Sequence, residues 1–381
     1  MKVLYLIDSL IGYGAEKSLV EITTRFKHIE PVFVQIYVGD QLKNILEENK
    51  ISVYSLNLTD KYNFQSAVNA VVQIIEKENP QIIHSTLFRA DIIARKIKKK
   101  LPHILLVGSL VNNSYSTYRF KEMNFRRRIQ HLIVKEWDKR TAKYVDYFIS
   151  NSEAILETNV EALKLKREKI QIIYRGRDFS LFSGKRVHQV LLPFEKKNSL
   201  VFFNVSRLEN RKGQKDLIRA FSLFLISNPS AKLLIAGEGP EEESIKDLID
   251  QIGINQSVFL LGYRKDISGL LKVADFFVFP SYFEGLPGAL IEAVISRTPT
   301  IISDIPENKE CLPNDNNLLF EPGNIEEMAK RMVEATQVKN WKERTELAFD
   351  FAHERFEINE ICKKYEKFYL NIIQKHMNAY N

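Results

Sequence analysis

Short apolar runs rich in Val, Ile and Phe alternate along this chain with longer segments whose apolar residues recur every three or four positions. The first pattern predicts buried strands and the second predicts helices with one apolar face. Strands that are apolar throughout are typical of parallel sheets covered by helices on both faces. Two series of strands are predicted, at 2–7, 31–38, 81–84, 103–109, 147–150 and 170–174, and at 200–205, 231–236, 258–261, 276–279, 300–303 and 318–320.

A polar, basic interval at 184–198 separates the two series and predicts a linker with a hinge near residue 190. The expected fold class is therefore α/β, with two doubly wound, Rossmann-like parallel-sheet domains facing a central cleft. We expect the domains at residues 1–190 and 191–355. Residues 356–381 carry an apolar helical stripe and are expected to form a terminal helix that packs back on the first domain.

Composition excludes several classes of protein. The chain has 381 residues, of which 45% are hydrophobic and 27% charged, so neither disorder nor a fibrous repeat is expected. Its two cysteines, Cys311 and Cys362, favour a reducing compartment over a disulfide framework, and no Cys or His cluster suggests structural zinc. The apolar start of the chain is interrupted by Asp8, too early for a signal peptide, and no apolar run is long enough to span a membrane. A cytoplasmic protein is expected.

Charge is distributed unevenly along the chain. Residues 1–186 hold 31 basic and 20 acidic residues, whereas the remainder holds 24 and 28. The segment 119–143 is the most basic, with nine basic and three acidic residues, and includes Arg126, Arg127 and Arg128. Apolar residues at helical spacing within it predict a basic amphipathic helix. Either this helix packs its apolar stripe into its own domain, or it docks to an anionic membrane surface at the inner face of the cell membrane. No motif indicates nucleic-acid binding.

Three local motifs follow predicted strands. Gly12-Tyr13-Gly14-Ala15-Glu16 could bring backbone amides to a phosphate, or could simply form a tight turn. The segment 206–213 places Arg207 and Lys212 at a strand's carboxyl end, where they suit a diphosphate, although a basic loop is often merely solvated. Gly237-Glu238-Gly239-Pro240 is a turn.

The segment 279–293 is the most informative. An apolar strand ends there in a glycine-rich turn, Gly285-Leu286-Pro287-Gly288, which runs into a helix. Glu284 precedes the turn, and Glu292 lies about one turn inside the helix. The free amides of the turn and the helix dipole favour an anion. The segment therefore combines two carboxylates with an amide nest suited to phosphate.

Glu284 and Glu292 stand in an E-x7-E arrangement that resembles the one in retaining nucleotide-sugar glycosyltransferases of family 4, which have the GT-B fold. The resemblance extends from residue 1 to about 355. The turn Tyr174-Arg175-Gly176-Arg177-Asp178 is similar to the family's Tyr-Asn-Gly-Val-Asp, with Arg175 in place of Asn. Further similar segments are Gly12 to Glu16, Ile149 to Glu153, Ser206 to Leu208, Lys212-Gly213, Gly237 to Pro240 and Leu261-Gly262-Tyr263.

The resemblance implies a role for each matching residue. The first domain would bind the acceptor and the second the nucleotide-sugar donor. Arg207 and Lys212 would hold the diphosphate, Glu284 would contact the donor sugar, and Glu292 would accept hydrogen bonds from the ribose. The other implied donor-binding residues are Gly14, Gly237, Tyr263, Gly285, Leu286, Pro287 and Gly288.

The implied reaction is hexosyl or N-acetylhexosaminyl transfer with retention at the anomeric carbon, in which Glu284, Arg207 and Lys212 act by positioning and charge stabilisation. The donor would be UDP- or GDP-linked, and the acceptor a glycan, a polysaccharide or a lipid-linked glycan. No cofactor is expected beyond the nucleotide-sugar co-substrate. No Asp-x-Asp triplet occurs, which agrees with a metal-independent mechanism and no metal site.

One departure from the family is the absence of a His after the strand 103–109, where many members contact the donor sugar. Asn112 or Asn113 could replace it by hydrogen bonding. His84 is assigned to the cleft as a further catalytic candidate, with a structural role at a strand end as the alternative.

Two other functions remain open at this point. The chain could be a non-catalytic GT-B protein that binds a membrane or a partner. It could also be a nucleotide-sugar epimerase of the same architecture. The presence of Glu284, Glu292, Arg207 and Lys212 favours an active transferase over the first alternative, and the nature of the product would distinguish the second.

Overall fold

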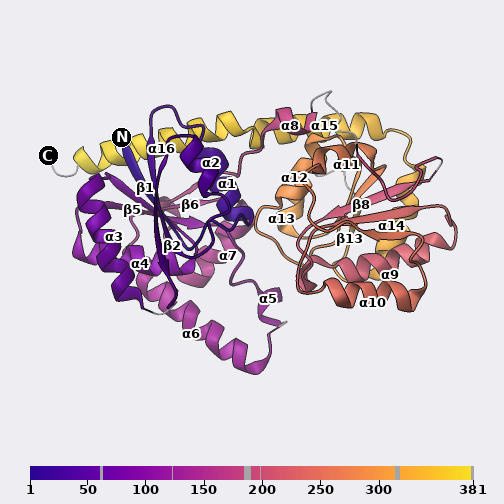
Figure 1. Ribbon diagram of the computed structural model, residues 1–381, viewed down its shortest axis with the longest axis horizontal. Coiled ribbons are helices and arrows are strands. Elements are labelled where there is room, and N and C mark those ends of the chain that lie inside the picture. Colours follow the sequence, from indigo (N-terminus) through magenta and orange to yellow (C-terminus); the bar gives the residue numbers. More distant parts are fainter. Residues whose placement is uncertain (61–62, 122, 184–189, 198, 314–317, 379–381) are drawn as a thin grey trace. The chain divides into compact units, whose positions relative to one another are not determined.

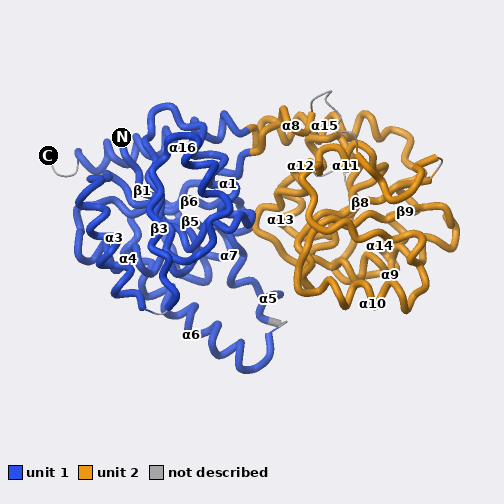
Figure 2. Tube along the Cα trace, in the orientation of Figure 1, with its two compact units in different colours: residues 1–176, 358–381 blue, residues 177–357 orange. Residues whose placement is uncertain are grey.

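The computed structural model describes residues 1–60, 63–121, 123–183, 190–197, 199–313 and 318–378. The chain forms two compact units, one of Met1–Gly176 together with helix α16 (Ile358–Asn378), the other of Arg177–Glu357 (Figure 2). The division falls after Gly176, whereas the polar, basic interval at 184–198 predicts it near residue 190. Residues 184–189 and 198 of the predicted linker lie outside the described residues.

Unit 1 contains a parallel sheet of seven strands in the order β3-β2-β1-β4-β5-β6-β7 (Figure 1). The strand order reverses between β1 and β4, as in a doubly wound fold. The strands are β1 (Lys2–Ile7), β2 (Glu30–Tyr37), β3 (Ser52–Leu58), β4 (Ile82–Thr86), β5 (Leu105–Leu110), β6 (Tyr147–Ser150) and β7 (Ile170–Ile172). The helices are α1 (Gly14–Thr23), α2 (Lys43–Glu48), α3 (Phe64–Glu78), α4 (Phe88–Lys100), α5 (Thr117–Lys121), α6 (Phe125–Ala142) and α7 (Glu153–Leu163), with a 3-10 turn η1 (Arg167–Lys169).

Unit 2 repeats this architecture with a parallel sheet in the order β10-β9-β8-β11-β12-β13. Its order reverses between β8 and β11. The strands are β8 (Val201–Val205), β9 (Lys232–Ala236), β10 (Val258–Leu260), β11 (Phe276–Phe279), β12 (Thr300–Ser303) and β13 (Leu318–Phe320). The helices are α8 (Phe179–Ser183), α9 (Gln214–Leu225), α10 (Glu242–Ile252), α11 (Ile267–Val273), α12 (Gly288–Ile295), α13 (Pro306–Lys309), α14 (Ile325–Gln337) and α15 (Trp341–Phe356), with a 3-10 turn η2 (Asn210–Lys212).

Both faces of the first sheet are buried, which explains why its strands are apolar throughout. In β1, Val3 and Tyr5 pack into one apolar cluster with α1 and α16, whereas Leu4 and Leu6 pack into a second cluster with α3 and α4. Successive side chains of a strand point to opposite faces, so both sets of positions must be apolar. The predicted two-domain α/β fold class is thereby confirmed.

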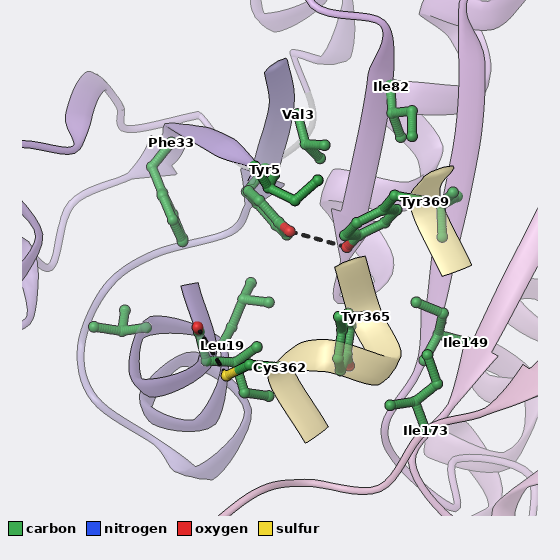
Figure 3. Packing of buried hydrophobic residues seen from close by; sticks show 14 of the residues in the cluster. Val3, Tyr5, Leu19, Phe33, Ile82, Ile149, Ile173, Cys362, Tyr365 and Tyr369 are labelled. Atoms are coloured by element: carbon green, nitrogen blue, oxygen red, sulfur yellow. Dashed lines mark hydrogen bonds between the residues drawn. The ribbon is translucent and has the colours of Figure 1, made fainter. Parts of the chain in front are cut away.

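The terminal helix α16 returns to unit 1 and completes its core. Figure 3 shows Tyr365, Tyr369 and Cys362 of this helix among side chains of the sheet and of α1. The Tyr369 hydroxyl lies 2.9 Å from the hydroxyl of Tyr5, and the Cys362 thiol donates to the carbonyl of Ile22. Both units are thus built around α/β cores. None of the described helices combines the length and apolar character needed to cross a membrane.

Candidate active site

Four loops of unit 2 gather at the carboxyl edge of its sheet. The loop 206–213 follows β8, 237–240 follows β9, 261–266 follows β10 and 280–287 follows β11. The strand order reverses between the neighbouring strands β8 and β11, and the loops that follow them lie side by side at this switch point, where the Tyr282 amide donates to the carbonyl of Arg211 at 2.9 Å. The two predicted charged segments therefore meet where doubly wound sheets bind ligands.

Glycines allow these loops to touch backbone to backbone. Gly213 has φ +71°, and a Cβ there would lie 2.3 Å from the carbonyl oxygen of Pro280. Gly237 has φ +131°, and a Cβ there would lie 2.0 Å from the carbonyl oxygen of Ser206. Neither position tolerates a side chain, because both the φ angle and the close approach exclude it. The glycines seen in the sequence thus hold the loops together.

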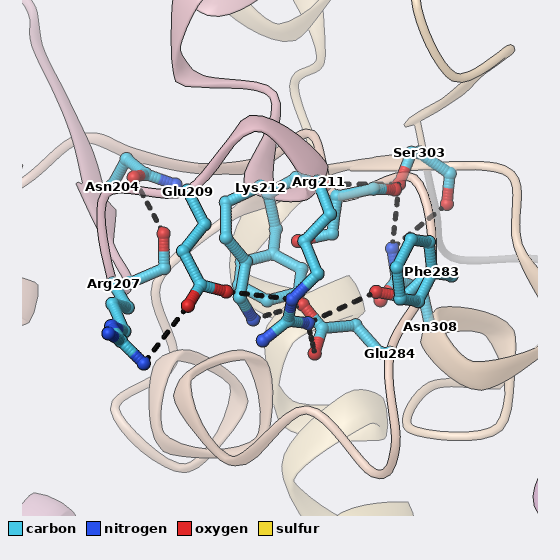
Figure 4. A network of polar contacts seen from close by, with 12 residues as sticks. Asn204, Arg207, Glu209, Arg211, Lys212, Phe283, Glu284, Ser303 and Asn308 are labelled. Atoms are coloured by element: carbon cyan, nitrogen blue, oxygen red, sulfur yellow. Dashed lines mark hydrogen bonds and ion pairs between the residues drawn. The ribbon is translucent and has the colours of Figure 1, made fainter. Parts of the chain in front are cut away.

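A network of charged side chains spans the loops 206–213 and 280–287 (Figure 4). The Lys212 ammonium donates to Oε1 of Glu284 at 2.5 Å, and Nη1 of Arg211 lies 3.6 Å from Oε2 of the same carboxylate. Glu209 lies between two arginines, 2.8 Å from Arg211 and 3.0 Å from Arg207. Three cations and two carboxylates therefore form one connected group.

Burial and pairing determine the ionisation of Glu284 and Lys212, which are 7% and 9% exposed. Burial raises the pKa of Glu284, but the charges of Lys212 and Arg211 outweigh it, and the pKa lies below its ordinary value. Burial, together with the charge of Arg211, lowers the pKa of Lys212 below its ordinary value even though Glu284 raises it. Glu284 is therefore an ionised carboxylate held by a desolvated cation.

Arg207 lies at the exposed end of the network. Its side chain is 45% exposed, in contrast to the buried Lys212. Its Nη1 pairs with Oε1 of Glu209 at 3.0 Å. Arg207 and Lys212, both predicted to hold a diphosphate, thus lie in one loop and in one network.

The glycine-rich turn ends at the start of α12. Leu286 is buried, and Pro287 is the N-cap residue, which has no side-chain oxygen to accept from the first amides of the helix. Gly288 opens the helix, and a Cβ there would lie 1.8 Å from Nη2 of Arg177. Glu292, one turn later, accepts a hydrogen bond from Nε of Arg177 at 3.0 Å. The two carboxylates of the E-x7-E arrangement therefore belong to separate charge pairs.

Tyr263 and Gly237 lie in neighbouring loops of the same edge. The Gly237 amide donates to the carbonyl of Gly262 at 2.8 Å, and the Tyr263 amide donates to the Glu238 carboxylate at 3.3 Å. The Tyr263 side chain is 68% exposed. Its predicted contact with a donor stays a prediction.

Gly14 begins α1 in unit 1, and Arg175 lies beside it. A Cβ on Gly14 would lie 3.3 Å from Nη1 of Arg175, so the glycine makes room for this guanidinium. Nη2 of Arg175 donates to the carbonyl of Val111 at 3.4 Å. The arginine that replaces the family's asparagine is therefore anchored against the glycine loop of unit 1.

The geometry argues against the prediction that His84 is catalytic. His84 is fully buried within β4, where its Nδ1 lies 2.6 Å from the Tyr369 hydroxyl and its Nε2 lies 2.7 Å from the Ser109 hydroxyl. Burial lowers the pKa of this imidazole to about 3. We therefore correct the assignment: His84 is a neutral core residue that joins β4, β5 and α16.

The sequence motifs predict no role for Glu209, Arg211 or Arg177. Glu209 and Arg211 lie in a segment that was singled out, and their alternating charges were the available signal. Arg177 stands where the family's turn has Val, a second departure beside Arg175. The pairing of Arg211 with Glu284, and of Arg177 with Glu292, depends on tertiary contacts that sequence spacing does not specify.

Two family models match adjacent parts of the chain. The model of glycosyltransferase family 4 matches residues 14–181, and that of group 1 glycosyl transferases matches residues 188–348. Together they cover most of each unit, without α16, and the second contains the whole charged network.

Relatives agree with these matches. An uncharacterized glycosyltransferase of Methanocaldococcus jannaschii is 34% identical over 171 residues, which are 42% of this chain and 40% of that protein. The UDP-Gal:alpha-D-GlcNAc-diphosphoundecaprenol alpha-1,3-galactosyltransferase of Escherichia coli is 26% identical over 279 residues, 71% of this chain and 70% of that protein. The chain thus spans less than half of the first relative and about two thirds of the second.

The fold is found among solved structures. HepE of Anabaena, crystallised with UDP and glucose, has a TM-score of 0.80 at 20% identity, and the match covers 97% of this chain and all of that one. This likeness shows the fold alone. With the two family models and the resemblance of its motifs, the chain belongs to the family 4-type glycosyltransferases of the GT-B fold.

Proposed function

We propose that this enzyme transfers a hexosyl or N-acetylhexosaminyl group from a UDP- or GDP-linked donor to a glycan, polysaccharide or lipid-linked acceptor, with retention and without a metal ion. The observation that carries the proposal is the buried Lys212–Glu284 pair, joined to Arg211 and Arg207 at the switch point of unit 2. The pair places cations beside a carboxylate at the reversal of strand order, where doubly wound sheets bind ligands.

Charge stabilisation explains how such a site would act. A departing nucleoside diphosphate gains negative charge as the glycosidic bond breaks, and fixed cations stabilise this charge. Arg207 and Lys212 would meet the diphosphate, and the amides at the start of α12 would meet its distal phosphate. Glu284 is ionised and would accept hydrogen bonds from sugar hydroxyls, which orients the donor. These groups supply positive charge without a metal ion or a cofactor.

The proposal for the acceptor rests on the name of a relative and on the excess of basic residues in the first half of the chain. The related E. coli enzyme acts, by its name, on a diphosphoundecaprenol-linked sugar. An acceptor of that class is anchored in a membrane, and a basic first half would favour its anionic surface. We therefore propose a lipid-linked or growing glycan acceptor met at the cytoplasmic face of the membrane.

Helix α6 is the proposed membrane contact. Trp137 in its second half packs against Phe64 and Phe88, so that part of the stripe belongs to the core of unit 1. Phe125 and Ile133 are 77% and 63% exposed, beside exposed arginines in the first turn. Figure 1 draws these first turns standing away from the sheet of unit 1. Exposed apolar and basic residues on one helix favour an anionic lipid surface.

The experiment is a thermal-shift panel followed by a product assay. We would test UDP, GDP, UDP-glucose, UDP-GlcNAc, UDP-galactose and GDP-mannose, because a ligand that binds the native state raises its midpoint. A selective shift identifies the base, and NMR of a product formed on a synthetic diphospholipid-linked sugar identifies the anomeric configuration. Retention supports the proposal, inversion or free epimerised nucleotide sugar contradicts it, and no shift with any nucleotide favours the non-catalytic alternative.

A further inference from the structure

Asp8 and Arg89 lie together at the carboxyl edge of the sheet of unit 1. Asp8 follows β1 directly, and Arg89 lies in the first turn of α4, the helix that follows β4. The strand order of unit 1 reverses between β1 and β4, which are neighbours. The two side chains are therefore at the position where doubly wound sheets bind ligands.

The two charges of this pair do not touch. Nη1 of Arg89 lies 3.9 Å from Oδ2 of Asp8, which is too far for a direct hydrogen bond. The other carboxylate oxygen, Oδ1, accepts from the amide of Ala90 at 2.8 Å. The side chains of Asp8 and Arg89 are 16% and 36% exposed. Oδ2 thus lies beside a partly exposed guanidinium, at a separation that a small polar group can bridge.

A similar pair at the opposite edge of the same sheet makes the direct contact. Asp146 comes immediately before β6, and its Oδ2 accepts from the amide of Leu106 at 2.8 Å. Nζ of Lys98, which like Arg89 belongs to α4, lies 2.6 Å from this oxygen. The two pairs have the same components, a carboxylate, a backbone amide and a cation of α4. Only the pair at the carboxyl edge leaves its charges apart.

The backbone before Arg89 is strained. Leu87, the N-cap residue of α4, has φ +80° and ψ 152°, a combination that is essentially confined to glycine. The conformation is held from both sides, because the Asp91 amide donates to the carbonyl of Leu87 at 2.9 Å and Asp8 holds the amide of Ala90. Strain of this kind is concentrated at ligand-binding sites, where it fixes the position of functional side chains.

The carboxylate of Asp8 is incompletely compensated by its surroundings. Burial raises its pKa to about 6, although the Ala90 amide and the charge of Arg89 both lower it. A further hydrogen-bond donor at Oδ2 would stabilise the charged form. A sugar hydroxyl supplies this donor, and its oxygen can accept from the guanidinium of Arg89 at the same time.

We propose that Asp8 and Arg89 bind one hydroxyl group of the acceptor sugar, which donates to Oδ2 of Asp8 and accepts from the guanidinium of Arg89. The inference rests on the proposed function and adds two acceptor-binding residues to it. A group that only donates or only accepts satisfies one of the two charges alone. The pair therefore selects a hydroxyl and orients the sugar ring that carries it.

The test measures acceptor kinetics and donor binding separately. Initial rates are recorded with GlcNAc-diphosphate on a synthetic lipid as the acceptor, at saturating donor, for the wild type, Asp8→Asn, Arg89→Gln and the double variant. Loss of a charge-assisted hydrogen bond weakens binding by about tenfold or more. We expect each single substitution to raise the acceptor KM by this factor, while the Kd of UDP or GDP from calorimetry changes by less than about twofold. The double variant should lose less than the product of the two effects, because both residues hold the same hydroxyl.

Asp146→Asn is the matched control, because Asp146 also accepts a backbone amide and pairs with a cation of α4. It should lower the melting midpoint and leave the acceptor KM unchanged. Arg89→Gln leaves the contact between Asp8 and Ala90 in place, so it tests the proposal even if Asp8→Asn does not fold.

Three results would count against the proposal. An unchanged acceptor KM for Arg89→Gln, with transfer intact, would overturn this inference and leave the proposed function in place. Single effects that multiply fully in the double variant would mean separate contacts and would overturn the shared hydroxyl. Absence of transfer by the wild type to this acceptor would overturn the proposed lipid-linked acceptor and this inference together.

Discussion

Glu284 and Lys212 form an ion pair that is almost entirely buried, so each depends on the charge of the other. Removing one partner leaves an uncompensated buried charge, which costs about 3–5 kcal/mol. We expect Glu284→Gln to lower the melting midpoint and to reduce turnover by about 10²-fold or more. Adding Lys212→Met should restore part of the midpoint but none of the turnover, as measured by calorimetry and a transfer assay.

Arg207 belongs to the same network, yet its replacement should affect turnover without lowering the melting midpoint. Its ion pair with Glu209 is partly exposed to solvent, and pairs near the surface contribute about 1 kcal/mol or less to stability. Arg207→Ala should therefore reduce turnover by about 10²-fold while the melting midpoint stays nearly constant. Turnover within threefold of the wild type, for this variant or for Glu284→Gln, would mean that the network does not face the diphosphate.

His84 provides a pH-dependent test of the corrected assignment. Its folded pKa of about 3 lies below the usual 6.5, so between these values the unfolded chain takes up a proton that the folded chain refuses. The contribution of His84 to stability is therefore present above pH 6.5 and is lost as the pH falls toward 3. By pH 5 the loss relative to pH 7.5 is about 2 kcal/mol.

His84→Gln removes this proton uptake and keeps hydrogen-bonding capacity toward Tyr369 and Ser109. Urea unfolding should show a smaller loss of stability between pH 7.5 and pH 5 for the variant than for the wild type. The variant must be compared with the wild type over the same pH range, because burial raises the pKa of Asp91 to about 7 and the protonation of Asp91 stabilises the folded state as the pH falls. That contribution is common to both proteins and cancels in the comparison. Turnover of the folded variant should stay within about twofold. A 10²-fold loss of turnover at an unchanged melting midpoint would restore His84 as a catalytic residue.

At the scale of elements, the strands differ in how well their sequences predict them. Strands such as β11 are apolar throughout because both faces are buried, and they lie where predicted. The strand β3 was missed, since it lies at the edge of the sheet and most of its residues are only partly buried. Ser55 and Asn57 alternate with Tyr54, Leu56 and Leu58, which pack against the second apolar cluster of unit 1, so the signal was a period of two and not a continuous apolar run.

The candidate site, like the strands, was predicted in one part and not in another. Its loops could be predicted because glycines and charged residues come directly after apolar strands. The pairing of Arg177 with Glu292, and of Arg211 with Glu284, could not be predicted. Those pairs join residues whose proximity arises from packing of separate elements, and sequence spacing carries no information on them.

The contact between the loops of β8 and β11 leads to a prediction with a matched control. Gly213 and Gly253 both have positive φ, at +71° and +77°. A Cβ on Gly213 would meet the carbonyl of Pro280, whereas a Cβ on Gly253 would meet nothing within 4 Å. Gly253→Ala therefore costs only backbone strain, about 1–2 kcal/mol.

Gly213→Ala should cost more than Gly253→Ala and should also weaken nucleotide binding, since Lys212 and Glu284 lie on the two loops that the methyl group would separate. Chemical denaturation and calorimetric titration with UDP or GDP measure the two effects. Equal destabilisation by the two substitutions, with unchanged affinity in both, would show that the close approach of these loops is unimportant for the site.

For the whole molecule, the uneven charge of the chain has its most direct consequence at α6. The first 186 residues carry the excess of basic residues, and the segment 119–143 is the densest part. Arg126 and Arg127 are exposed beside Phe125, whereas Arg128 lies 5.3 Å from the ring of Phe120 and is partly buried. The first two arginines are therefore the ones available to a lipid surface.

Charge reversal at Arg126 and Arg127 should weaken binding to vesicles containing anionic lipid without unfolding the protein. Each basic residue near such a surface contributes about 1 kcal/mol, and this contribution falls as salt is added. Sedimentation with anionic and with neutral vesicles measures the effect. The control is charge reversal at Lys99 and Lys100, which are exposed on α4 and change the net charge equally. If both pairs of substitutions reduce binding alike, net charge alone attracts the vesicles, and α6 is not the contact.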